Sequence, residues 1–153
     1  MPRKILVIGA GKSSFYLFDY LLSKAHEEDL ELTIGDIRPE NIPVSIACHP
    51  HCTVLKLDIF KEAERKNAIS NATIVVSMLP ASLHIKIAKD CLQYGKHLVT
   101  ASYVSPELKV LDKKVKAAGL IFMNEIGLDP GIDHMSAMQI IEKKKKKGGK
   151  IIL

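Results

Sequence analysis

The sequence predicts an α/β protein whose parallel sheet is doubly wound, with helices on both faces. Two observations carry this prediction. Six short apolar runs alternate along the chain with polar or helix-like segments, and the first run leads directly into a glycine-rich turn, GAGKSS. Such alternation favours parallel strands joined by crossover helices. Because these crossovers are right-handed, the doubly wound arrangement is the simplest topology.

The strands are expected where apolar and β-branched residues run together before a turn. Residues 4–11, KILVIGAG, end in glycines, which is typical of a buried parallel strand that opens a turn. Pro80 ends the fourth run. In chain order, the expected strands cover residues 4–11, 30–37, 52–59, 72–80, 97–102 and 120–125.

The helices are expected between these strands. Gly95 and Gly119 stand where a helix would end in a left-handed cap, and Pro106 stands where a first helical turn would begin. The expected helices cover residues 13–25, 61–69, 84–95 and 106–119, and a further helical pattern starts at residue 134.

Composition indicates one domain with a real core and excludes several classes of protein. The chain has 153 residues, and no apolar run in it is long enough to span a bilayer. Its three cysteines make no disulfide framework, so a cytoplasmic location is expected. The net charge of +5 is concentrated in the run Lys143–Lys147, which predicts a solvated helix end. Few aromatic residues accompany this charge, so no nucleic-acid partner is expected.

The glycine-rich turn predicts a site for a dinucleotide, as in Rossmann folds. Gly9 allows the tight turn, and Gly11 lets a pyrophosphate approach the backbone at the amino end of the following helix. Ser14 replaces the third glycine of the usual pattern but is small enough to preserve helix–strand packing. The spacing excludes a GxxxxGK[ST] phosphate loop.

Asp36 at the end of the second strand predicts NAD as the cofactor. Its carboxylate is placed to accept hydrogen bonds from a ribose diol and would repel a 2′-phosphate. Arg38, two residues later, could attract that phosphate instead, so NADP stays open.

Other strand ends supply further candidates, because such sheets bind ligands at their carboxyl edge. Asp58 and Ile59 end the third strand near the expected adenine, and Met78–Pro80 and Thr100–Tyr103 end the fourth and fifth. His84 is expected either near the nicotinamide or as a solvated helix residue, and Cys91 is expected in the core. The cluster CHPHC at 48–52 has the wrong spacing for a zinc finger, and no metal site is expected.

The stretch NEIGLDPGIDHMSAM, residues 124–138, follows the sixth strand at the same edge. Asp133 is expected to cap the helix that begins at HMSAM, which leaves Asp129 to point into the cleft. The alternative is that both acids only cap the helix.

The blocks GAGKSS, VVSMLPASLH, KHLVTASYVSPEL, AAGLIFMNEIGLDPGIDH and GGKI resemble saccharopine dehydrogenase of the glutamate-forming kind, and the resemblance covers nearly the whole chain. It implies a nicotinamide enzyme that transfers a hydride at the carbon–nitrogen bond joining glutamate to a lysine-derived semialdehyde. That family is usually described with NADP, whereas Asp36 favours NAD.

The resemblance also implies roles for individual residues. Asp129 would be catalytic and would border the substrate with Ser102 and Tyr103. The resemblance and the strand-end candidates together give the expected cofactor-binding residues: Gly9, Gly11, Lys12, Ser13, Ser14, Asp36, Ile37, Arg38, Asp58, Ile59, Met78, Leu79, Pro80, Ala101, Gly127 and Leu128.

The expected organisation is a dinucleotide-binding domain over residues 1–133 and the truncated start of a substrate domain over residues 134–153. We therefore expect a fragment of a two-domain enzyme, inactive alone, that acts on a small amino-acid-derived substrate, spans no membrane and forms a homodimer at full length. Two rival hypotheses are a related oxidoreductase acting on another amino-acid-derived imine, and a regulatory module that binds NAD without turnover.

Overall fold

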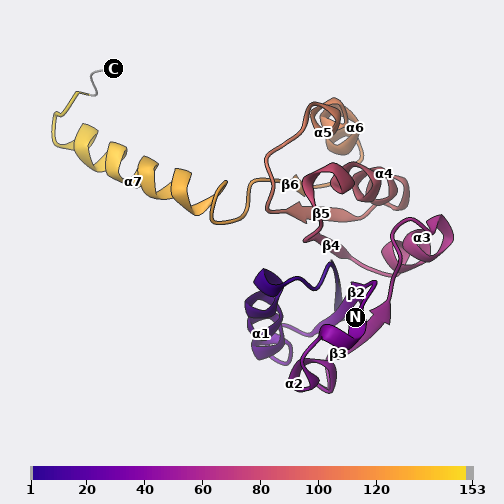
Figure 1. The fold of residues 1–153 in the computed structure, drawn as a ribbon. Coiled ribbons are helices and arrows are strands. Elements are labelled where there is room, and N and C mark those ends of the chain that lie inside the picture. The colour runs from indigo at the N-terminus through magenta and orange to yellow at the C-terminus, as the bar shows by residue number, and fades with distance from the viewer. Residues whose placement is uncertain (1, 151–153) are drawn as a thin grey trace.

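The computed structural model describes residues 2–150. Its centre is a six-stranded parallel sheet in the order β3-β2-β1-β4-β5-β6 (Figure 1). The strands are β1 (Arg3–Ile8), β2 (Leu30–Asp36), β3 (Cys52–Lys56), β4 (Ile74–Ser77), β5 (His97–Thr100) and β6 (Phe122–Met123). The predicted doubly wound α/β fold is therefore confirmed.

Helices cover both faces of the sheet. They are α1 (Phe15–Lys24), α2 (Val44–Ala47), α3 (Glu62–Ser70), α4 (His84–Tyr94), α5 (Pro106–Val110), α6 (Asp112–Ala117) and α7 (Ile132–Lys146), with 3-10 turns η1 (Lys12–Ser14), η2 (Pro39–Asn41) and η3 (Ala81–Leu83).

Alternate residues along each strand point to opposite faces, and this gives two apolar clusters. On one face Val7 and Ile34 pack with Phe18 of α1. On the other face Leu6 packs with Ile87 of α4, and Cys91 is fully buried in the same cluster, as expected.

The strand order places a crevice at the carboxyl edge of the sheet. The chain runs outward from β1 through β2 to β3 and then returns to β4 on the other side of β1. The connections that leave β1 and β4 therefore diverge, and doubly wound sheets bind ligands at this switch point.

Two predicted elements differ from those observed. The expected helix at 106–119 is divided at Leu111, because the Leu111 N–H bonds to the carbonyl of Leu108, one residue nearer than in an α-helix. The expected strand at 120–125 pairs with β5 only at Phe122 and Met123, and the chain then turns at Glu125, whose φ is +62°. Gly95 takes the expected left-handed cap conformation at the end of α4, with φ of 65°.

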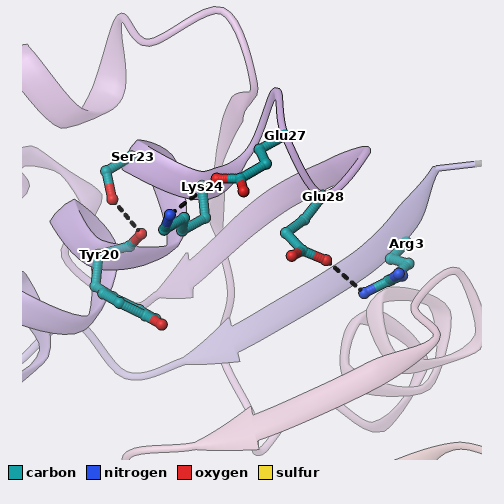
Figure 2. A network of polar contacts seen from close by, with 6 residues as sticks. All are labelled: Arg3, Tyr20, Ser23, Lys24, Glu27 and Glu28. Carbon is teal, nitrogen blue, oxygen red and sulfur yellow. Dashed lines mark hydrogen bonds and ion pairs between the residues drawn. The ribbon is translucent and has the colours of Figure 1, made fainter.

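A group of exposed polar contacts lies at the amino end of the sheet, opposite the crevice (Figure 2). Arg3, the first residue of β1, pairs with Glu28 at 3.0 Å, and Lys24 pairs with Glu27 at 2.8 Å. Ser23 donates a hydrogen bond to the Tyr20 carbonyl. Exposed pairs of this kind contribute little stability, so this corner is suitable for control substitutions.

Helix α7 extends away from the sheet (Figure 1). None of its residues is buried, and large apolar side chains such as Met135 and Met138 are at least half exposed. Its lysines lie exposed in the last turn, as the sequence predicted. Among residues 2–150, no helix is long and apolar enough to cross a membrane.

Candidate functional site

The glycine turn connects β1 to η1 and α1, and it lies against Met78, just beyond the end of β4. Gly9 has φ of +102°, and a side chain there would have its Cβ 3.0 Å from the Met78 carbonyl oxygen. The N–H of Gly9 donates to the Gly35 carbonyl at 2.9 Å, which ties the turn to β2. This position therefore needs glycine for both its conformation and its close backbone approach.

Gly11 serves a different purpose, because the space beside it is open. Its φ and ψ of −69° and 169° suit any residue, and an added Cβ would meet no atom within 4 Å. The fold itself therefore does not require glycine here. Buried Ser14 donates its hydroxyl to the Gly9 carbonyl at 3.1 Å and so fixes the turn where the third glycine usually stands. Lys12 and Ser13 are exposed beside this space.

Asp36 closes the turn from the end of β2. One carboxylate oxygen accepts a hydrogen bond from the Ala10 N–H at 2.7 Å, and the other accepts one from the Arg38 N–H at 2.8 Å. A carboxylate has about four acceptor sites, so each oxygen keeps a free lone pair for a hydroxyl group.

An apolar cleft of about 170 Å³ lies beside Asp36. Eleven residues line it: Ile8, Gly9, Gly35, Asp36, Ile37, Leu57, Asp58, Ile59, Phe60, Leu79 and Leu83. The open space at Gly11, the fixed acid and this cleft together fit a pyrophosphate, a ribose and a flat apolar ring.

Sequence reasoning missed part of this cleft. Leu57, Phe60 and Leu83 line it but were not among the expected residues. Phe60 is 67% exposed, and an exposed aromatic ring just beyond a strand end is the signal that could have identified it. The expectation that Asp58 ends the third strand was wrong: β3 ends at Lys56, and Asp58 instead accepts the Phe60 N–H in the following turn.

The far side of the crevice is built by the segments after β4, β5 and β6. Met78 donates its N–H to the Ile8 carbonyl at 2.9 Å, and Leu79 and Pro80 follow it. A Cβ on Gly127 would lie 3.1 Å from the Ala101 side chain, so this glycine allows the two segments to approach. Leu128 is 76% exposed beside them.

Tyr103 and Asp129, predicted from separate motifs, lie together. The Tyr103 hydroxyl donates to Asp129 Oδ1 at 2.7 Å, and the Tyr103 ring lies edge-on to His134 with centroids 6.4 Å apart. The hydrogen bond to Asp129 raises the pKa of the Tyr103 phenol. Both residues are exposed, so the pair is accessible to a ligand.

The hydrogen bond between Tyr103 and Asp129 can be tested by titrating the Tyr103 phenol. In Asp129→Asn the pKa of Tyr103 should fall, because the charge that disfavours the tyrosinate is removed. Spectrophotometric titration of tyrosinate in both proteins measures the shift, with Tyr103→Phe identifying the contribution of this residue. An unchanged titration curve would show that the pair does not form in solution.

The prediction that Asp133 caps the helix was wrong. Gly131 holds the cap position without a side-chain hydrogen bond, and α7 begins at Ile132. Asp133 lies inside the first turn and accepts the Gly131 N–H at 2.8 Å. Gly131 itself has φ of +149°, and a Cβ there would lie 2.6 Å from the Gly127 nitrogen. The start of α7 therefore depends on the backbone conformation of Gly131, and the hydrogen bond from the Gly131 N–H to Asp133 stabilises it.

His84 is buried rather than solvated. It is 1% exposed, and its two ring nitrogens lie 2.8 Å from Ser77 Oγ and 2.8 Å from Ser102 Oγ. It thus links the end of β4 with the segment after β5. Burial lowers the pKa of His84, which favours the neutral ring.

The CHPHC segment lies away from the crevice, before β3. His49 and His51 have ring centroids 5.9 Å apart, and His26 lies 6.5 Å from His51. Within residues 2–150, no group of three or more histidine, cysteine or acidic side chains is arranged to hold a metal ion.

Comparison with known proteins supports a single family. The family model described as "Saccharopine dehydrogenase NADP binding domain" matches residues 5–123. Bovine mitochondrial alpha-aminoadipic semialdehyde synthase is 35% identical over 150 residues, which cover 97% of this chain and 16% of that protein. Saccharopine dehydrogenase [NADP(+), L-glutamate-forming] of Schizosaccharomyces pombe is 34% identical over 151 residues, covering 99% of this chain and 33% of that protein.

A solved structure agrees with this assignment. Apo saccharopine dehydrogenase (L-Glu forming) from Saccharomyces cerevisiae superimposes with a TM-score of 0.85 at 29% identity, over 97% of this chain and 33% of that one. Homoserine dehydrogenase of S. aureus, at 17% identity and a TM-score of 0.59, shares the fold alone. The chain thus spans a third or less of the length of these saccharopine-related proteins. It belongs to the family of saccharopine dehydrogenase NADP-binding domains.

Proposed function

We propose that this chain is the dinucleotide-binding part of an NAD(P)-dependent oxidoreductase that acts on the CH–NH bond of saccharopine. The enzyme would interconvert saccharopine with glutamate and 2-aminoadipate semialdehyde. The observation that carries the proposal is the pairing of two features at one sheet edge. A glycine turn with a fixed acid and an apolar cleft lies at one end, and the Tyr103–Asp129 pair lies at the other.

In this proposal the chain's own groups bind and orient the reactants. The Gly9–Ser14 turn and the amino end of the helix after it bind the pyrophosphate. Asp36 accepts hydrogen bonds from the ribose hydroxyls. The adenine packs against Ile37, Ile59 and Leu79, all of which line the apolar cleft. A bound nicotinamide would supply hydride transfer at the carbon–nitrogen bond. Asp129 then orients the cationic amine, and Tyr103 holds the Asp129 carboxylate in place.

We also propose that residues 1–133 form the dinucleotide-binding domain and that residues 134–153 begin a substrate domain. Four exposed apolar side chains on α7, those of Ile132, Met135, Met138 and Ile140, support this division, because several exposed apolar side chains on one element indicate a surface that other structure covers. The cytoplasmic location and the homodimer stay predictions.

Two measurements test the proposed function. Calorimetric titration of the chain with NADH and NADPH should detect binding of at least one nucleotide. The full-length protein should then reduce NAD(P)⁺ when given saccharopine and release glutamate. Nucleotide binding without turnover on saccharopine would favour the regulatory module, and absence of nucleotide binding would overturn the proposal.

We propose that the chain prefers NAD, although the family is described with NADP, because the Asp36 carboxylate would repel a 2′-phosphate. In Asp36→Ser the preference for NADH should narrow by about tenfold, since repulsion and two hydrogen bonds to the diol are lost together. The ratio of the two dissociation constants, measured by calorimetry, gives the result.

Arg38→Ala is the matched variant for this test. Arg38 is exposed and follows Asp36 by two residues, so it is the cation available to a 2′-phosphate. If the wild-type chain binds NADPH more tightly and Arg38→Ala removes that advantage, Arg38 rather than Asp36 decides the cofactor.

A further inference from the structure

A buried hydrogen-bond chain runs from β4 to the substrate side of the crevice through His84. Ser77 is the last residue of β4 and is fully buried. His84 opens α4, and Ser102 follows β5 by two residues. The three polar groups are therefore brought together from segments that carry the two halves of the site.

The surroundings of Ser77 indicate which group donates and which accepts in each of these hydrogen bonds. Within the part of the molecule that the structure describes, His84 Nδ1 is the hydrogen-bond partner of the Ser77 hydroxyl, at 2.8 Å, and no other partner is found. A buried hydroxyl that does not donate its proton loses a hydrogen bond that water would have accepted. Ser77 must therefore donate, and Nδ1 must be the unprotonated nitrogen that accepts.

A neutral imidazole carries one proton, so the proton of His84 lies on Nε2. Nε2 is 2.8 Å from Ser102 Oγ, so with this tautomer the ring donates its N–H to the Ser102 oxygen. Ser102 then uses an acceptor site for His84 and keeps its own hydroxyl proton free. Ser102 is only partly buried, so that proton can reach a ligand.

We propose that Ser77 and His84 act as positioning residues that turn Ser102 into a hydrogen-bond donor to an acceptor oxygen of the ligand. The acceptor is either the carboxamide oxygen of the nicotinamide or a carboxylate oxygen of the amino-acid substrate. This inference rests on the proposed function, because it takes Ser102 to border the reactants. Neither Ser77 nor His84 touches a ligand in this arrangement; both act through Ser102.

The tautomer of His84 is measurable without any ligand. The chain is labelled with ¹⁵N-histidine, and long-range ¹H–¹⁵N spectra are recorded at about pH 8, where unperturbed histidines are neutral. The His84 signals, assigned by their loss in His84→Asn, should report a protonated Nε2 and a bare Nδ1. In Ser77→Ala the constraint on Nδ1 is gone, and the population should move toward the other tautomer. A wild-type ring protonated on Nδ1, or on both nitrogens, overturns the inference.

The ligand contact is tested with Ser102→Ala, with Ser23→Ala as the control at the opposite end of the sheet (Figure 2). If the carboxamide is the acceptor, Ser102→Ala should weaken binding of NAD(P)H by about three- to tenfold but leave binding of ADP-ribose, which lacks the nicotinamide, unchanged. If a substrate carboxylate is the acceptor, both affinities should persist, and the KM for saccharopine in the full-length protein should rise by a similar factor. No change in any of the three constants overturns the inference.

These outcomes separate the inference from the function on which it rests. If the wild-type chain binds no nucleotide, the proposed function fails, whatever the tautomer of His84. If nucleotide binds and saccharopine is turned over but Ser102→Ala behaves as Ser23→Ala, the positioning role alone is wrong.

Discussion

Replacing Gly11 by valine is expected to weaken the binding of NAD(P)H by about a hundredfold while leaving the melting temperature of the chain unchanged. The loss corresponds to about 3 kcal/mol, the order of two hydrogen bonds from backbone N–H groups to a charged phosphate. Valine places its branched side chain where the pyrophosphate must approach the turn. Titration calorimetry and thermal unfolding on the same samples measure the two quantities.

This substitution can separate an effect on nucleotide affinity from an effect on stability, because the fold does not require glycine at position 11. The backbone at Gly11 is extended, and a Cβ there meets no atom within 4 Å. The backbone of position 11 is therefore compatible with valine, and the Cβ of the new side chain lies in open space. Any loss of affinity then reports on the space that the ligand occupies.

Gly9→Ala is the matched control, since it should do the opposite. Its φ of +102° disfavours any side chain, and the new Cβ would press against the Met78 carbonyl at 3.0 Å. This variant should lower the melting temperature. If Gly11→Val binds NAD(P)H as tightly as the wild type, the pyrophosphate does not lie at this turn.

The fold was predictable because its signals are local and repeated. β1 and β4, the two central strands of the sheet, contain apolar runs of several residues. The turn after β1 needs glycine at position 9, because the φ of +102° there disfavours any side chain. Gly95 is similar, since a left-handed helix cap favours glycine in any helix.

Two positions could not be decided from the local sequence: the solvated alternative for His84 and the cap predicted at Asp133 were both wrong. His84 is an ordinary helix residue by its local pattern, and its burial depends on Ser77 at the end of β4 and Ser102 in the segment after β5, which both lie against it. Asp133 has the composition of a cap, but Gly131 takes that position because only a residue without a side chain fits against Gly127. Local propensity cannot decide either case.

The pairing of Tyr103 with Asp129 was predictable only in part. Both residues were expected at the carboxyl edge of the sheet, because each follows a strand. Their direct hydrogen bond, across 26 positions of the chain, depends on how the loop after β6 folds back toward the end of β5. The sequence indicated the edge, and the three-dimensional path of that loop determines the contact.

Asp129→Asn in the full-length protein is expected to lower turnover on saccharopine by about a hundredfold or more, with little change in melting temperature. Asparagine keeps an oxygen that can accept the Tyr103 hydroxyl, so the geometry of the pair survives while its negative charge is lost. A carboxylate that orients a cationic amine, and stabilises charge that develops at carbon, is worth this order of rate. Because Asp129 and Tyr103 are exposed, the fold does not depend on the charge.

Asp133→Ala separates site chemistry from structure at the same loop. Asp133 accepts the Gly131 N–H at the entrance to α7, and it does not bond to Tyr103. Loss of the Asp133 carboxylate should lower the melting temperature and leave turnover nearly unchanged at temperatures where both proteins are folded. Initial rates with saccharopine and thermal unfolding curves, recorded for both variants and the wild type, give the comparison. If Asp129→Asn keeps full turnover but melts many degrees lower, or Asp133→Ala abolishes turnover with an unchanged melting curve, the two roles are reversed.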